Sequence, residues 1–180
     1  GSKITILFSD IRGFTSMSEK LSPTQIVKLL NKYFKSMIDV VFKFNGTLDK
    51  IVGDELMVLY GVPLKNEGDT ENAVKTAVQM FKSLDKFNER IIKDGFKPFK
   101  IGIGINKGKA VSGNIGSDQQ MNYTVIGDTI NLGARLCSHA KSGQILISNS
   151  VKDVSGDNYD FKKIPTIEVK GKSKPIEVWS

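Results

Sequence analysis

Two aspartates beside apolar segments are candidate ligands for a divalent cation. Asp10 follows the apolar segment 3–8, and Asp54 lies in a short turn between the apolar segments 48–52 and 56–60. If these segments are neighbouring strands, both carboxylates meet at one edge of a sheet. Carboxylates in such a place suit Mg²⁺, which shares its ligand shell with phosphate oxygens. The alternative is that both are ordinary turn aspartates that hydrogen-bond to the backbone.

Asn131 and Arg135 are candidate groups for binding a phosphate. They are four residues apart in the segment 128–140, which follows Gly127 and has the apolar spacing of a helix. Both side chains therefore project from one helix face. A helix N-terminus, an amide and a guanidinium together stabilise negative charge on a phosphate. The alternative is a surface helix with ordinary polar residues.

The cysteine and histidine content excludes several other kinds of site. Cys137 and His139 are the only residues of their types, so an internal disulfide and a metal site built from several cysteines or histidines are excluded. We expect both residues to be structural parts of the helix 128–140. A chain with one cysteine is typical of a reducing compartment.

These candidate residues depend on a fold that mixes strands and helices. Ser22, Pro23 and Gln25 are typical of a helix start, because Ser22 suits the N-cap and Gln25 closes a capping box. The spacing of apolar residues predicts helices from there to residue 44 and over 69–93. Alternating or continuous apolar residues predict strands at 3–8, 48–52, 56–60, 101–105, 109–115, 123–126 and 145–148, with a turn at 106–108 and two or three short strands in 159–179.

The order of these elements predicts an α+β fold. The core reads strand, helix, strand, strand, helix, strand, which is the ferredoxin-like βαββαβ order, and a C-terminal α/β extension follows it. Such a core has an antiparallel-rich sheet with its helices packed on one face. The first strand then lies beside the hairpin 48–60, which brings Asp10 and Asp54 to one sheet edge.

Length and composition fit a single soluble domain. The chain has 180 residues, of which 39% are hydrophobic and 25% charged. No apolar run approaches the ~18–20 residues that span a bilayer. We expect one domain over residues 3–180, with Gly1 and Ser2 as a cloning scar. The net charge of +7 favours anionic partners such as nucleotides, nucleic acid or a lipid surface, and the alternative is a solvated lysine-rich surface.

Four motifs, in order, resemble the catalytic domain of the class III nucleotidyl cyclases. They are FSDIRGFT at 8–15, GDE at 53–55, YTVIGDTINLGARL at 123–136 and VKGK at 169–172. The resemblance spans residues 3–179, and the bacterial adenylyl cyclase branch is the most similar. It implies an enzyme that converts ATP to 3′,5′-cyclic AMP and pyrophosphate.

The resemblance implies a role for each candidate residue of the catalytic centre. Asp10 and Asp54, with the carbonyl of Ile11, would hold two Mg²⁺ or Mn²⁺ ions per site, the two-metal arrangement of phosphoryl transfer. Asn131 would position the ribose. Arg135 would stabilise charge on the transferring phosphoryl group.

The resemblance also implies how the substrate is recognised. Lys50 and Thr124 match the pair that reads the base, and a lysine donor with a threonine acceptor suits the N1 and N6 edge of adenine. Lys170 would bind the terminal phosphates. Related bacterial domains often carry a basic residue in the place of Gln119 or Gln120, so triphosphate binding here is expected to be weaker or to use another lysine.

The partners implied are ATP and a second copy of the chain. In this family the aspartates come from one subunit and the base, ribose and phosphate residues from the other, so a head-to-tail homodimer has two composite sites. We expect the domain to act in the cytoplasm, joined to regulatory domains in a parent chain that is either soluble or membrane-anchored.

Three other functions compete with adenylyl cyclase. A guanylyl cyclase generally has glutamate with cysteine or serine in place of Lys50 and Thr124. A regulatory cyclase homologue typically lacks a metal aspartate or the Asn/Arg pair, all of which are present. A nucleic-acid binder needs exposed aromatic residues on a sheet face, whereas Phe8 and Tyr60 lie in apolar runs, so no nucleic-acid partner is expected.

Overall fold

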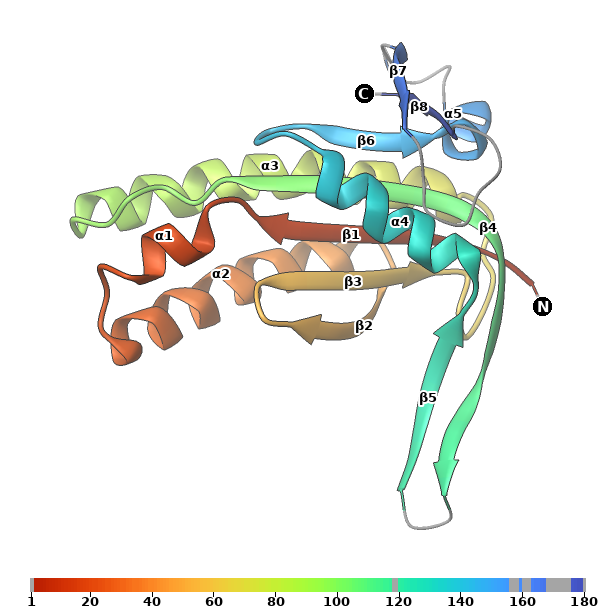
Figure 1. Ribbon diagram of the computed structural model, residues 1–180, viewed down its shortest axis with the longest axis horizontal. Coiled ribbons are helices and arrows are strands. Elements are labelled where there is room, and N and C mark those ends of the chain that lie inside the picture. Colours follow the sequence, from red (N-terminus) through yellow and green to blue (C-terminus); the bar gives the residue numbers. More distant parts are fainter. Residues whose placement is uncertain (1, 118–119, 156–158, 160–162, 168–175, 180) are drawn as a thin grey trace.

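The computed structural model describes residues 2–117, 120–155, 159, 163–167 and 176–179. Within these residues the chain forms a mixed sheet with helices on both faces (Figure 1). The elements in chain order are β1 (Ser2–Ile11), α1 (Phe14–Ser18), α2 (Pro23–Lys43), β2 (Thr47–Val52), β3 (Glu55–Tyr60), α3 (Asp69–Lys93), β4 (Ile101–Ser117), β5 (Gln120–Ile126), α4 (Asp128–His139), β6 (Ile145–Ser148), α5 (Asn149–Ser155), β7 (Lys163–Ile167) and β8 (Ile176–Trp179).

The sheet has the strand order β2-β3-β1-β4-β6-β8-β7, which confirms the predicted α+β core and its C-terminal extension. Strand β1 is antiparallel to both β3 and β4, whereas β4 and β6 are parallel. Strand β5 pairs with the second half of β4, and this hairpin extends away from the rest of the sheet as an arm (Figure 1).

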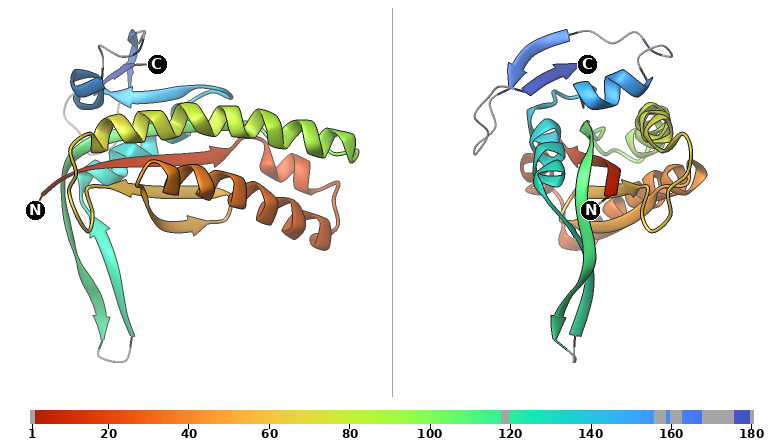
Figure 2. Two further views of the ribbon diagram at one scale, coloured as in Figure 1. Left: turned by 180° about the vertical axis from the view of Figure 1, so that it is seen from behind. Right: turned by 90° about the vertical axis from the view of Figure 1, so that its right-hand side faces the viewer.

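Helices cover both faces of the sheet. As predicted, α2 and α3 pack together on one face. Helix α4, for which no face was predicted, covers the opposite one (Figure 2). The alternation of side chains along β1 explains the two layers. Leu7 and Ile11 lie in the core with α2 and α3, while Ile6 and Phe8 lie in the core that includes Cys137 of α4. Asp10 continues the series of Ile6 and Phe8 and therefore lies on the α4 side.

The start of α2 follows the sequence prediction. Ser22 is the N-cap, and its hydroxyl accepts a hydrogen bond from the Gln25 backbone N–H at 3.2 Å. The Gln25 side chain accepts one in return from the Ser22 backbone N–H at 3.0 Å. Helix α2 is thereby fixed at its N-terminus, and its residues Tyr33 and Met37 are fully buried against the sheet.

The turn predicted at residues 106–108 is wrong. Strand β4 is continuous there and pairs with β1 without interruption from Ala110 to Ile101. Asn106 is buried and donates from its side chain to the Thr129 carbonyl at 3.0 Å. A side chain on Gly108 would meet Thr129. Asn106 and Gly108 therefore allow α4 to pack against the strand, and they do not form a turn.

In the part of the chain that the structure describes, no helix combines the length and the apolar character needed to cross a bilayer.

Candidate active site

The structure brings Asp10 and Asp54 together at the end of β1. Asp10 is the penultimate residue of β1 and stands directly opposite Glu55, the first residue of β3. Asp54 precedes Glu55 in the tight turn between β2 and β3. The Asp10 side chain is 27% exposed, and its Oδ1 atom is buried with no hydrogen-bond partner among the described residues.

The neighbouring carboxylates of Asp10, Asp54 and Glu55 form a cluster in which the ionised forms of Asp10 and Glu55 are destabilised. The pKa of Asp10 is raised to about 6, first by burial and then by the charge of the neighbouring Asp54 and a hydrogen bond that the pair can share. Arg12 and the Ile11 backbone act in the opposite direction. Burial, with the charges of Asp10 and Asp54, also raises the pKa of Glu55.

The donor set fits a hard divalent cation. Carboxylate oxygens are the ligands that Mg²⁺ and Mn²⁺ prefer, and a bound cation would satisfy the buried Oδ1 of Asp10 and relieve its repulsion with Asp54. Among the described residues, no three histidine, cysteine, aspartate or glutamate side chains form a group that could hold a metal. The candidate ligands for a divalent cation at this edge of the sheet are therefore the carboxylates of Asp10 and Asp54 and the carbonyl of Ile11.

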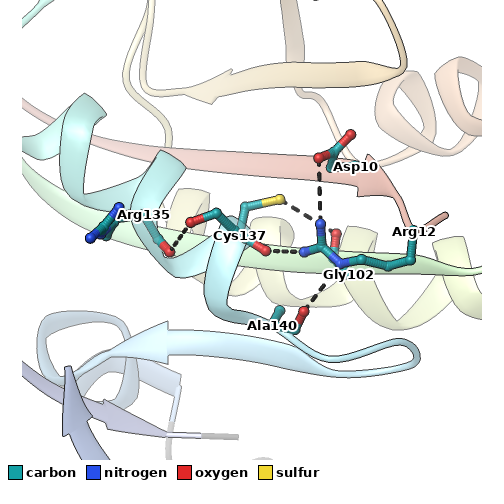
Figure 3. Close-up of polar contacts among 7 residues, drawn as sticks. Asp10, Arg12, Gly102, Arg135, Cys137 and Ala140 are labelled. Atoms are coloured by element: carbon teal, nitrogen blue, oxygen red, sulfur yellow. Dashed lines mark hydrogen bonds and ion pairs between the residues drawn. The ribbon is translucent and has the colours of Figure 1, made fainter. Parts of the chain in front are cut away.

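Arg12 is a site residue that the sequence reasoning missed. Its Nη1 atom lies 3.4 Å from Asp10 Oδ2, and its Nε donates to the Ala140 carbonyl at 3.1 Å (Figure 3). Its Nη2 atom donates to the Cys137 carbonyl. Glu55, the last residue of the GDE motif, is a second residue to which the sequence assigned no role. For both, the available signal was proximity: Arg12 is two residues after Asp10, in the turn that follows β1, and Glu55 adjoins Asp54.

Asn131 and Arg135 lie on α4 with exposed side chains. The inner face of α4 is formed by Gly133, Leu136 and Cys137, all buried against the sheet. The Arg135 guanidinium lies on the far side of Cys137 from Asp10 (Figure 3). One chain therefore does not bring Arg135 to its own carboxylates.

Lys50 and Thr124 lie on different hairpins. Lys50, on the edge strand β2, has a 48% exposed side chain, and its Nζ lies 3.5 Å from Asp49 Oδ2. The pairing of β2 with β3 shifts register between Leu48 and Lys50. Thr124 pairs with Gly113 in the arm, and its side chain is outside the described set.

For Lys170, Gln119 and Gln120 the sequence-based expectations stay predictions. Lys170 and Gln119 lie outside the described residues, and Gln120 is the first residue of β5. Cys137 is buried, and burial raises the pKa of its thiol to about 12, so it stays neutral. It donates to the Gly102 carbonyl at 3.5 Å, in keeping with the structural role expected for it.

A βαββαβ core with two carboxylates at the end of its first strand, and an Asn/Arg helix across the sheet from α2 and α3, is the arrangement of a nucleotidyl cyclase domain. The sequence model for the adenylate and guanylate cyclase catalytic domain matches residues 1–179. The chain belongs to this family.

Two bacterial adenylate cyclases are among the relatives of this chain. Adenylate cyclase from Anabaena cylindrica is 37% identical over 98% of this chain, and adenylate cyclase 1 from Rhizobium meliloti is 30% identical over 98%. The chain spans 36% and 27% of their respective lengths.

Solved structures agree with the fold. The guanylyl cyclase Cya2 is 41% identical with a TM-score of 0.94, covering 99% of this chain and 90% of that one. The adenylyl cyclase CyaB from P. aeruginosa is 38% identical with a TM-score of 0.94, covering 98% and 92%.

Proposed function

We propose that this chain is an adenylyl cyclase that converts ATP to 3′,5′-cyclic AMP and pyrophosphate. The observation that carries the proposal is the Asp10–Asp54 pair. One buried carboxylate oxygen of the pair has no hydrogen-bond partner in the described part of the chain, and the two negative charges repel each other, so a bound cation would stabilise both. Family membership supplies the reaction, because the relatives named above are adenylyl or guanylyl cyclases.

In the reaction, the 3′-oxygen of the ribose bonds to the α-phosphorus, the bond from that phosphorus to the bridging oxygen breaks, and the 3′-hydroxyl proton is lost as pyrophosphate leaves. Two Mg²⁺ or Mn²⁺ ions held by Asp10, Asp54 and the Ile11 carbonyl would favour the 3′-oxygen as a nucleophile and neutralise the triphosphate. Asn131 orients the ribose so that the 3′-oxygen faces the phosphorus. Arg135 donates hydrogen bonds to the phosphoryl oxygens as their charge grows.

We further propose that the working form is a head-to-tail homodimer. Because Arg135 lies on the far side of Cys137 from its own Asp10 (Figure 3), a second copy is the simplest source of an Asn131 and Arg135 facing each carboxylate pair. Each site then takes its aspartates from one chain and its α4 residues from the other, and two equal sites result. Lys170 binds the terminal phosphates in this arrangement.

ATP is the proposed substrate because of Lys50 and Thr124. A lysine donor and a threonine acceptor match the adenine edge, and a site that hydrogen-bonds a base rejects one that leaves its groups unpaired. The relatives include a guanylyl cyclase at 41% identity, so GTP is the competing substrate. The two bacterial relatives are longer than this chain. Their length supports a further proposal, that regulatory segments of a longer chain control the activity of this domain.

The test is product formation from ATP and from GTP with Mg²⁺ and with Mn²⁺, followed by separation of cyclic AMP, cyclic GMP and pyrophosphate. It should be run across protein concentrations, because dimer formation limits the rate at low concentration. We expect cyclic AMP and pyrophosphate in equal amounts from ATP. Faster formation of cyclic GMP from GTP would make the chain a guanylyl cyclase. A folded dimer that makes neither product would be a regulatory homologue.

A further inference from the structure

Arg12 joins three elements that the proposed mechanism needs in fixed positions. It follows the end of β1, and its backbone N–H donates to the Lys100 carbonyl, just before β4, at 2.7 Å. Its side chain reaches the carbonyls of Cys137 and Ala140 at the C-terminus of α4, and its Nη1 lies 3.4 Å from Asp10 Oδ2 (Figure 3).

The α4 contacts are those expected of a C-terminal cap. The last carbonyls of a helix have no partner within the helix and carry the negative end of its dipole, so a cation there both hydrogen-bonds and neutralises. The Asp10 contact occupies Oδ2 and leaves the buried Oδ1 without a donor among the residues that the structure describes. One guanidinium thus fixes the end of α4 and the orientation of the Asp10 carboxylate.

Strand β4 leaves space for this arrangement. Gly102 stands directly opposite Asp10, and a Cβ at Gly102 would overlap the Arg12 guanidinium, lying 3.0 Å from Cζ and closer to Nε and Nη2. Two positions along the strand, a Cβ at Gly104 would overlap the backbone of Cys137. The absence of side chains at these two positions is what allows α4 and Arg12 to lie against the sheet.

We propose that Arg12 is a positioning residue that serves both composite sites of the dimer at once. Through Asp10 it acts on the site to which its own chain gives the aspartates. Through α4, a rigid helix in which Asn131 lies about 9 Å from Cys137, it acts on the site to which its own chain gives Asn131 and Arg135. This inference rests on the proposed composite sites.

The first test separates geometry from charge. Arg12→Lys keeps the positive charge near Asp10, but an ammonium cannot contact Asp10 and both α4 carbonyls with the fixed fork of a guanidinium. We expect kcat to fall about 10- to 100-fold, as when a group that orients a metal ligand is removed, with the KM for ATP nearly unchanged. Gly102→Ala should act in the same way, because it displaces the guanidinium while Arg12 itself is unchanged. Arg90→Lys, at an exposed position on α3, is the matched control.

The second test uses mixed dimers under conditions that exchange subunits. Mixing Asp10→Ala with Asn131→Ala gives dimers in which one site carries both lesions and the other carries none, so activity should recover to about a quarter of wild type. This mixture is the positive control for the composite sites themselves. Arg12→Ala is then mixed separately with each of these two variants.

The two mixtures distinguish the possible roles of Arg12. If Arg12 acted only on Asp10, mixing with Asn131→Ala would restore one intact site. If it acted only on α4, mixing with Asp10→Ala would do so. Because we propose that Arg12 acts on both Asp10 and α4, neither mixture should recover activity. Tagged co-purification should show that each mixture forms mixed dimers, and each should melt close to the wild-type temperature.

The outcomes that overturn the inference are distinct from one another. Recovery to about a quarter in either Arg12→Ala mixture would confine Arg12 to one site. An Arg12→Lys variant with wild-type kcat, below its melting temperature, would reduce Arg12 to a structural role. If the positive control fails while exchange is demonstrated, the composite-site proposal is wrong and the two-site role of Arg12 falls with it.

Discussion

Replacing Asp10 with asparagine should stabilise the metal-free protein at neutral pH while abolishing catalysis. The pKa of Asp10 is raised from 3.8 to about 6, first by burial and then by Asp54. Because the folded state binds this proton more tightly than the unfolded state, the contribution of Asp10 to the free energy of unfolding decreases as pH rises from about 4 to 6. Above pH 6 the ionised carboxylate is a net cost to the metal-free fold.

The size of the effect follows from the shift. Two pH units correspond to about 3 kcal/mol at most, and the 27% exposure of the side chain and its contact with Arg12 reduce this. We expect Asp10→Asn to raise the free energy of unfolding by about 1–3 kcal/mol at pH 7.5 in EDTA, and by only about a third as much at pH 4.5, where the folded carboxyl is protonated but most of the unfolded one has already ionised.

Urea unfolding of both proteins at the two pH values measures this difference. Asp85→Asn, at an exposed position on α3, is the control and should change stability little at either pH. Saturating Mg²⁺ should then stabilise the wild type and not Asp10→Asn, because only a ligand that binds the folded state shifts unfolding. A variant less stable than wild type at pH 7.5 in EDTA would refute the electrostatic reasoning.

Three further variants, one of them a double substitution, test the fold and the substrate. Gly104→Ala should cost about 1–3 kcal/mol of stability by overpacking, because its Cβ overlaps α4. Gly113→Ala on the same strand is the control, because its Cβ meets nothing within 4 Å. Equal melting temperatures for the two variants would contradict this prediction. Ser22→Ala should cost about 1 kcal/mol through loss of the cap, measured by urea unfolding, and no change would show that the capping box adds nothing. The double change of Lys50 to Glu and Thr124 to Cys should lower kcat/KM for ATP relative to GTP, and an unaltered preference would show that these residues do not read the base.

The sequence predicted the frame of the fold because its local signals agree with its tertiary packing. The capping residues of α2, the helical spacing of α3 and α4, and the hairpin at Asp54 are each encoded within a few residues. The convergence of Asp10 and Asp54 followed from the order of elements alone. The prediction failed at 106–108, where Gly108 was interpreted as a turn residue, because a glycine that makes space for a helix has the same local signature as a glycine in a turn.

The role of Arg12 was beyond sequence reasoning for a related reason. Its partners at the end of α4 are 125 and 128 residues away, and nothing near Arg12 in the chain indicates that a helix ends there. The alternation of isoleucine and glycine in residues 101–105 identified a strand but gave no reason for the glycines. Once α4 is seen to lie on that glycine face, the two observations explain each other. The glycines let the helix approach, and the approach places its last carbonyls within reach of Arg12, which also contacts Asp10. A site that depends on close approach between distant segments is therefore encoded in residues that carry no chemistry of their own.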